Sequence, residues 1–249
     1  MFALQEEAVT PSFEVLLVLG AIGFYLFDSA MLLYANELVF AETNGRWIFA
    51  CPGSRWRLLG KNPYLPNPLT PDDPLFRVCW SVSEPSKRQE DQDALRHFIR
   101  ALTPLRYMVF VLLMLLLIGL PLVLYRFGTG LGLFLLLGVI YLTITVMLIQ
   151  TYRRREVLGL SGKVFAGLAF DSLACAPFAL NMVRKITLRR SLVGDPISFA
   201  HKIFDADTFA RLVNALCNRV DEELELEDEE SSRCSELEAY RNRITGMVS

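Results

Sequence analysis

The sequence predicts an α-helical integral membrane protein with three transmembrane helices and a small cytoplasmic α+β portion. Residues 105–125 and 131–150 are two long apolar runs, and together they contain one charged residue, Arg106. Helices of about 20 residues, rising 1.5 Å per residue, cover roughly the 30 Å of a bilayer core. Residues 126–130 join the two runs as a short outer hairpin, and 53% of the 249 residues are apolar. These observations predict that both runs cross a membrane.

Residues 15–36 form the first predicted transmembrane helix, which Asp28 interrupts. The alternative is a secretory signal peptide, which needs positive charge ahead of a short apolar core. Residues 1–14 contain Glu6, Glu7 and Glu14 but no Lys or Arg. We therefore predict that residues 15–36 remain as a membrane span.

The distribution of Lys and Arg sets the predicted orientation, because cytoplasmic loops are enriched in these residues. Residues 1–14 have none, residues 126–130 have only Arg126, and residues 37–104 are rich in both. Arg153, Arg154 and Arg155 follow the third span. The N-terminus is therefore expected outside and the C-terminus in the cytoplasm, in a plasma membrane or a bacterial inner membrane.

Residues 164–183 are also apolar and offer a fourth span as an alternative. Asp171 and Asn181 make crossing costly, and crossing would place the following basic residues outside. We expect instead a helix that lies at the inner membrane surface or packs into the cytoplasmic domain. The candidate membrane-surface basic residues are Arg153, Arg154, Arg155, Arg184, Lys185, Arg189 and Arg190.

The cytoplasmic portion at residues 37–104 predicts a β-hairpin followed by an amphipathic helix. Asn44 and Gly45 separate two runs rich in β-formers, which is a strong hairpin signal. Residues 75–82 predict a further strand, with Phe76, Val78 and Trp80 on one face. An apolar stripe at helical spacing precedes the second span and consists of Leu95, Phe98, Ile99 and Leu102.

The second cytoplasmic portion, residues 151–220, predicts helices. Asp205 or Asp207 is a suitable N-cap. The amphipathic stripe after it consists of Phe209, Leu212, Val213, Leu216, Cys217 and Val220. We expect it to pack against residues 164–183 or a partner. Residues 221–249 predict a solvated acidic tail that is dispensable for folding, with a short helix at residues 236–244.

The sequence offers little catalytic chemistry. Its five cysteines lack metal-site spacing, its two histidines lack a nearby acid or Cys pattern, and it has no nucleotide-binding fingerprint. We expect no cofactor, no metal and no nucleic acid partner, because the basic residues flank the predicted spans. Asp28 is the intramembrane polar candidate. Its expected partners are Tyr141, Thr143 and Thr145, in either a structural or an ion-handling role.

The expected function is that of a non-enzymatic accessory or scaffold protein that presents a cytoplasmic domain to a protein partner. The first alternative is a subunit of a transporter or channel that uses Asp28. Three spans are few for a lone transporter, so this alternative implies a homo-oligomer. The second alternative is a membrane enzyme of unknown type.

Overall fold

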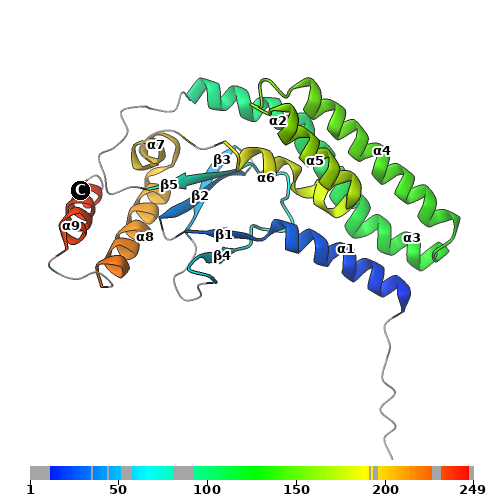
Figure 1. The fold of residues 1–249 in the computed structure, drawn as a ribbon, viewed down its shortest axis with the longest axis horizontal. Coiled ribbons are helices and arrows are strands. Elements are labelled where there is room, and N and C mark those ends of the chain that lie inside the picture. The colour runs from blue at the N-terminus through cyan, green and yellow to red at the C-terminus, as the bar shows by residue number, and fades with distance from the viewer. Residues whose placement is uncertain are drawn as a thin grey trace, which may run out of the picture.

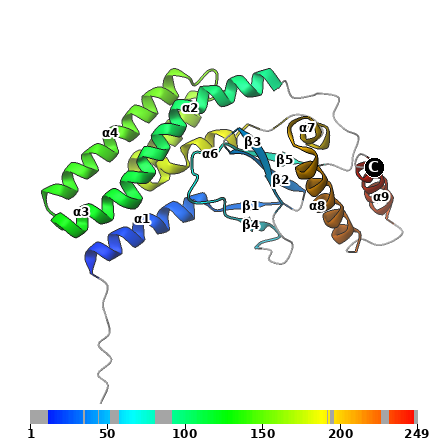
Figure 2. The same ribbon diagram turned by 180° about the vertical axis from the view of Figure 1, so that it is seen from behind.

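A computed structural model describes residues 12–34, 36–43, 45–51, 58–80, 92–190, 192, 196–225 and 231–246. The described chain is mostly helical, with a small sheet region and two helices that are long and apolar enough to cross a membrane. Long helices gather at one end of the molecule, and the sheet with three further helices lies at the other (Figure 1). Figure 2 shows the same division from behind.

The helical part contains the two long apolar helices. One runs without interruption over Gln92–Phe127, and α4 covers Leu131–Arg153. The first comprises α2 (Gln92–Met114), a π-helical turn (Leu115–Gly119) and α3 (Leu120–Phe127). The predicted amphipathic helix and the second predicted span are thus one continuous helix, with Pro104 inside it. The expected stripe is confirmed, since Leu95, Phe98 and Leu102 are buried.

The π-helical turn lies just before Pro121. Proline has no N–H, so the carbonyl four residues earlier loses its usual donor. The backbone widens instead, and the N–H of Leu120 bonds to the carbonyl of Leu115. The widened turn packs beside α4, where the position of a Cβ on Gly119 would lie 3.4 Å from Leu136 Cδ1.

Helix α1 covers Phe13–Ser29 and is shorter than the span predicted at residues 15–36. Ser29 Oγ donates to the carbonyl of Tyr25, and Ala30 N–H donates to that of Leu26, which satisfies the helix end. The chain then becomes extended. Met31–Leu33 form strand β1, which pairs antiparallel with β4 (Asn62–Tyr64).

Residues 164–183 do not form one helix. The structure has α5 (Gly162–Ala174), a 3-10 turn (Ala176–Asn181) and α6 (Met182–Thr187). Cys175 is extended at the break, and Pro177 begins the next turn. At 13 residues, α5 is about 20 Å long and too short to cross a bilayer alone. The predicted surface helix is therefore a broken one that packs among α1, α2 and α4 (Figure 1).

In the described residues, three antiparallel strands form the larger sheet, in the order β3-β2-β5. Their bounds are β2 Glu37–Thr43, β3 Arg46–Ala50 and β5 Leu75–Cys79. The predicted hairpin is confirmed by the β2–β3 pairing and by Gly45, whose φ is 77°. Asn44 lies outside the described residues. The predicted strand at 75–82 is confirmed as far as Cys79, and Phe76, Val78 and Trp80 are all buried.

Three helices cover the sheet: α7 (Pro196–Ile203), α8 (Ala206–Leu224) and α9 (Ser232–Thr245). Asp205 caps α8 by accepting from Thr208 N–H at 2.8 Å, as predicted. The stripe of α8 packs on Leu38, Phe40, Val78 and Trp80 of the sheet. The expectation that it packs on residues 164–183 is therefore wrong, although the stripe is buried within the chain.

The C-terminal segment is folded over residues 232–245, contrary to the solvated tail that we expected. Leu237, Tyr240 and Ile244 of α9 are buried in the same core as α8. The ring of Tyr240 stacks on Trp80, with centroids 5.5 Å apart. Residues 226–230 of the acidic run lie outside the described residues. A terminal helix was predicted, but its burial was not.

Candidate functional site

Asp28 lies in the last turn of α1 and faces α6. Its Oδ1 is 2.8 Å from Lys185 Nζ, and its Oδ2 accepts from Asn181 Nδ2 at 3.0 Å. Lys185 also approaches Asp171 Oδ2 of α5 at 3.8 Å. The charged end of α1 is thus held by residues from the broken helix. The carboxylate has its own counter-ion.

The partners that we expected for Asp28 are wrong. The hydroxyls of Thr143 and Thr145 donate to the carbonyls of Val139 and Tyr141, within α4, and both bonds are exposed. The sequence did not indicate Lys185 as the partner, because its basic neighbours favoured a place at the membrane surface. One sequence pattern could have indicated this pairing: Asn181 lies one helical turn before Lys185, so both polar side chains share one face of the helix.

Arg184 extends the polar network from Asp28 to the segment that precedes β5. Its side chain is 2% exposed, and its NH2 donates to the carbonyls of Asn67 (2.6 Å) and Thr70 (2.7 Å). Burial lowers the pKa of Arg184. The nearby Tyr25 and Asp73 side chains raise it again in part. Tyr25 OH donates to Pro68 O at 2.6 Å. Arg184 is therefore a structural cation rather than the surface residue that we expected.

A second charged cluster surrounds Arg106. Its NH1 lies 2.6 Å from Glu42 Oε2, its NH2 lies 3.5 Å from Asp73 Oδ1, and its Nε lies 3.8 Å from Asp72 Oδ2. Thr43 Oγ1 donates to Asp73 Oδ2 at 2.8 Å. Burial raises the pKa of Asp72, and Asp73 raises it further. The cluster joins α2 to the sheet, and its one cation neutralises only part of the acidic charge.

The remaining basic candidates lie around the ends of α4 and α6. Arg154 NH1 donates to Ala101 O at 2.8 Å, and the guanidinium of Arg155 lies 4.7 Å from the ring centroid of Tyr152. Arg190 lies 4.6 Å from the ring centroid of Phe98. Arg153 and Arg189 are exposed. Of the seven predicted residues, only Arg184 is buried, Lys185 is partly buried against Asp28, and the others are partly or fully exposed.

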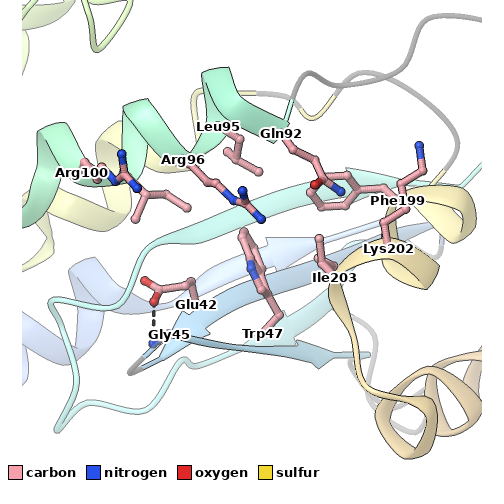
Figure 3. A pocket seen from close by; sticks show the side chains of 11 residues that line it. Glu42, Gly45, Trp47, Gln92, Leu95, Arg96, Arg100, Phe199, Lys202 and Ile203 are labelled. Carbon is pink, nitrogen blue, oxygen red and sulfur yellow. Dashed lines mark hydrogen bonds between the residues drawn. The ribbon is translucent and has the colours of Figure 1, made fainter.

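A groove of about 380 Å³ opens in the sheet region between the β2–β3 hairpin, the start of α2 and α7 (Figure 3). Trp47 and Phe199 form its aromatic floor, with ring centroids 6.1 Å apart. Three cations line it, Arg96 and Arg100 from α2 and Lys202 from α7. Sequence analysis did not find this groove, because its walls come from three segments that are distant in the chain.

Among the described residues that line the groove, Glu42 is the one with a carboxylate, and both of its oxygens have partners. Oε1 accepts from Gly45 N–H at 2.7 Å, and Oε2 contacts Arg106. This described part of the lining includes no Cys or His. Partial burial and the Glu37 carboxylate raise the pKa of Cys79 elsewhere on the sheet, so that thiol stays protonated. This arrangement suits binding of an anionic group better than nucleophilic or acid–base chemistry.

Among the residues that the structure describes, no group of three or more His, Cys, Asp or Glu side chains is placed to hold a metal ion. Comparison with protein families, with curated proteins and with solved structures found no match. The function is therefore argued from the contacts described above.

Proposed function

We propose that this protein is an integral membrane scaffold that presents its sheet region to a protein partner in the cytoplasm. The proposed spans are α1, residues 105–125 of the continuous helix α2–α3, and α4. The apolar length of the two long helices supports the proposal, as do the basic residues around the end of α4. Large apolar side chains on their outer faces are exposed, including Phe110, Phe134 and Leu142.

Helix α1 is the shortest of the proposed spans. Its 17 residues cover about 25 Å, so the bilayer would thin locally or the helix ends would rise toward the headgroups. Asp28 lies at the proposed cytoplasmic end and is neutralised by Lys185. Such pairing lowers the cost of a charge near the membrane, which supports α1 as a span.

The groove of Figure 3 is the observation that carries the scaffold function. Cations above an aromatic floor match a partner segment that combines acidic and apolar side chains. Aromatic residues and Arg are also the side chains that most often dominate binding energy at protein interfaces. We therefore assign the groove to an acidic segment of a cytoplasmic protein.

The groove is tied to the proposed membrane helices by rigid contacts. Arg96 and Arg100 stand on the same uninterrupted helix that continues into the second span. Arg106, two turns further, binds the β2 residue Glu42 and the loop residue Asp73. A partner bound in the groove would be held at a fixed place relative to the bilayer, as a scaffold requires.

The contacts of Asp28 favour this function over an oligomeric transporter or channel. A carboxylate that binds a transported ion needs an open side, whereas Asp28 contacts Lys185 and Asn181 and its side chain is 13% exposed. The transporter alternative depended on Asp28 as its ion-binding residue. If Asp28 has a structural role, this alternative has no candidate ion site. The carboxylate of Glu42, which lines the groove, is already bonded on both oxygens, so it gives no support to the enzyme alternative.

Affinity purification of the full chain in mild detergent tests the scaffold function. We expect a stoichiometric protein partner with the wild type and its loss with Arg96→Gln/Arg100→Gln. The matched control is Arg211→Gln/Arg233→Gln, which removes two exposed cations from α8 and α9. The control should retain the partner. A symmetric homo-oligomer without a second protein would contradict the scaffold proposal and restore the channel alternative.

A further inference from the structure

A second cavity, of about 600 Å³, lies between α2, the loop that follows α4, the start of α5 and the end of α6. Phe98, Val157, Val164 and Ile186 form its apolar walls, and Arg189 and Arg190 stand at its polar side. Glu156 is the one acidic residue among the described residues of the lining, and it is exposed. The cavity thus combines apolar walls with two adjacent cations.

Arg189 is placed to receive an anion, and Arg190 adds positive charge beside it. The guanidinium of Arg190 lies over the ring of Phe98, at 4.6 Å from the centroid, and this contact orients it. Arg189 is exposed, and neither a hydrogen bond nor an ion pair joins it to any residue that the structure describes. Guanidinium groups bind phosphate oxygens well, because their planar N–H groups match the spacing of those oxygens.

The neighbouring contacts place the cavity at headgroup depth in the proposed orientation. Arg154 bonds to Ala101 O at 2.8 Å, only one turn before the apolar run that begins at residue 105. Tyr152 and Phe165 pack with centroids 5.3 Å apart, and Arg155 lies over Tyr152. Aromatic and basic side chains gather where a protein meets the membrane–water interface.

We propose that this cavity binds the phosphate-bearing headgroup of an anionic phospholipid from the cytoplasmic leaflet. Arg189 and Arg190 contact the phosphate, and Val157 and Val164 contact the apolar part of the lipid next to it. The proposal rests on the membrane insertion proposed above. Basic pockets at the cytoplasmic ends of membrane helices suit such headgroups by charge and by depth.

Binding of fluorescent phosphatidylglycerol to the full chain in zwitterionic detergent tests the assignment. Each cation near an anionic group contributes about five-fold in affinity, so Arg189→Gln/Arg190→Gln should weaken binding about 20- to 30-fold. The matched control is Arg153→Gln/Lys163→Gln, which removes two exposed cations from the same end of the helices, outside the lining. We expect less than three-fold weakening there. Equal losses in both variants would overturn the site, because they would show only diffuse attraction.

A second variant tests whether binding needs the open cavity as well as its positive charge. Val157→Trp keeps every cation and places a large side chain in the cavity, at a residue that is already 43% exposed. It should weaken phosphatidylglycerol binding at least ten-fold without loss of helical circular dichroism. Unchanged binding in this variant would also overturn the proposal.

Two further arms identify the source of the phosphate. Phosphatidylcholine should bind at least ten-fold more weakly than phosphatidylglycerol, and inorganic phosphate at the same concentration should not displace the lipid. Displacement by inorganic phosphate would overturn the lipid assignment. Alkaline extraction of membranes tests the underlying insertion separately: release of the chain would overturn both proposals, whereas retention with indistinguishable variants would overturn only the lipid site.

Discussion

Asp28 shows how one charged residue can be kept in a mostly apolar helix. Its 2.8 Å contact with Lys185 and its bond from Asn181 occupy both carboxylate oxygens. Asp28→Leu removes both contacts and leaves the Lys185 charge with only the more distant Asp171. Loss of one member of a buried ion pair costs about 3 to 5 kcal/mol. Because both side chains keep some exposure, we expect the lower end of this range.

Thermal unfolding in detergent checks this prediction. Asp28→Asn retains the shape and the bond from Asn181 but also leaves Lys185 without its nearest counter-ion, so it should cost about 2 kcal/mol, less than Asp28→Leu. The control is Asp171→Asn, which removes a contact of 3.8 Å from a side chain that is half exposed, and it should change little. If all three variants kept wild-type stability but lost function, Asp28 would have an ion-handling role instead.

Asp72 gives a prediction on pH. Burial raises the pKa of this carboxyl, so the folded state binds its proton more tightly than the unfolded state does. Its stabilising contribution is full below the ordinary value of 3.8 and is lost as pH rises through the higher folded pKa. Asp72→Asn should therefore gain stability relative to wild type as pH rises from about 3 to 7.

The measurement is the unfolding midpoint of both proteins at several pH values. Asp93→Asn serves as the control, because that side chain is 91% exposed, and it should show no trend. A wild type that becomes more stable than Asp72→Asn as pH rises would contradict the prediction.

Helix α9 is the element whose importance the sequence concealed. Its polar composition predicted a short helix within a solvated tail, yet three of its side chains enter the core of α8 and the sheet. Tyr240→Ala removes a buried aromatic ring that stacks on Trp80. It should therefore lower the free energy of unfolding of the sheet region by about 3 to 4 kcal/mol.

Chemical denaturation, followed by the fluorescence of Trp80 and the other tryptophans, measures this effect. Glu238→Ala, on the exposed face of the same helix, should change the stability by less than about 0.5 kcal/mol. Removal of residues 231–249 should destabilise the region more than Tyr240→Ala does. A truncated chain with full stability would restore the dispensable tail.

Local patterns predicted the elements that local physics determines. The Asn44-Gly45 turn, the alternation before Trp80 and the stripe after Asp205 each depend on neighbours within a few residues. The break at Cys175 was missed because most of residues 164–183 are apolar, as in one continuous helix. Contact with α1, α2 and α4 allows two short pieces to replace one long helix there.

The candidate sites depend on contacts that are distant in the sequence, and they were predicted only in part. Asp28 was identified because a charge in an apolar run is costly wherever its partner lies. The pairing of Lys185 with Asp28 and the groove around Trp47 were not identified, because the chain forms them only after α6 and α7 have packed.

The arrangement of the whole molecule leads to a prediction on topology. Epitope tags inserted at Thr129 and after Gly246 should lie on opposite sides of the membrane, because α4 and the sheet region separate them. Antibody should reach the tag at Thr129 in intact cells and the tag after Gly246 only after permeabilisation. The reverse pattern would contradict the proposed orientation. If antibody reached both tags in intact cells, the chain between Thr129 and Gly246 would not cross the membrane an odd number of times, as the proposal requires.

The pairing of α1 with the broken helix also affects the order of events during synthesis. Asp28 is separated from Asn181 by 153 residues, and Lys185 emerges later still. At 5 to 20 residues per second, a ribosome needs about 8 to 30 s to make the intervening chain. During that interval the first helix carries a carboxylate without its counter-ion, in contact with the insertion machinery or with lipid. A ribosome that stalls before residue 181 therefore leaves the Asp28 carboxylate without either partner, and this charge distinguishes the unfinished chain from the complete one.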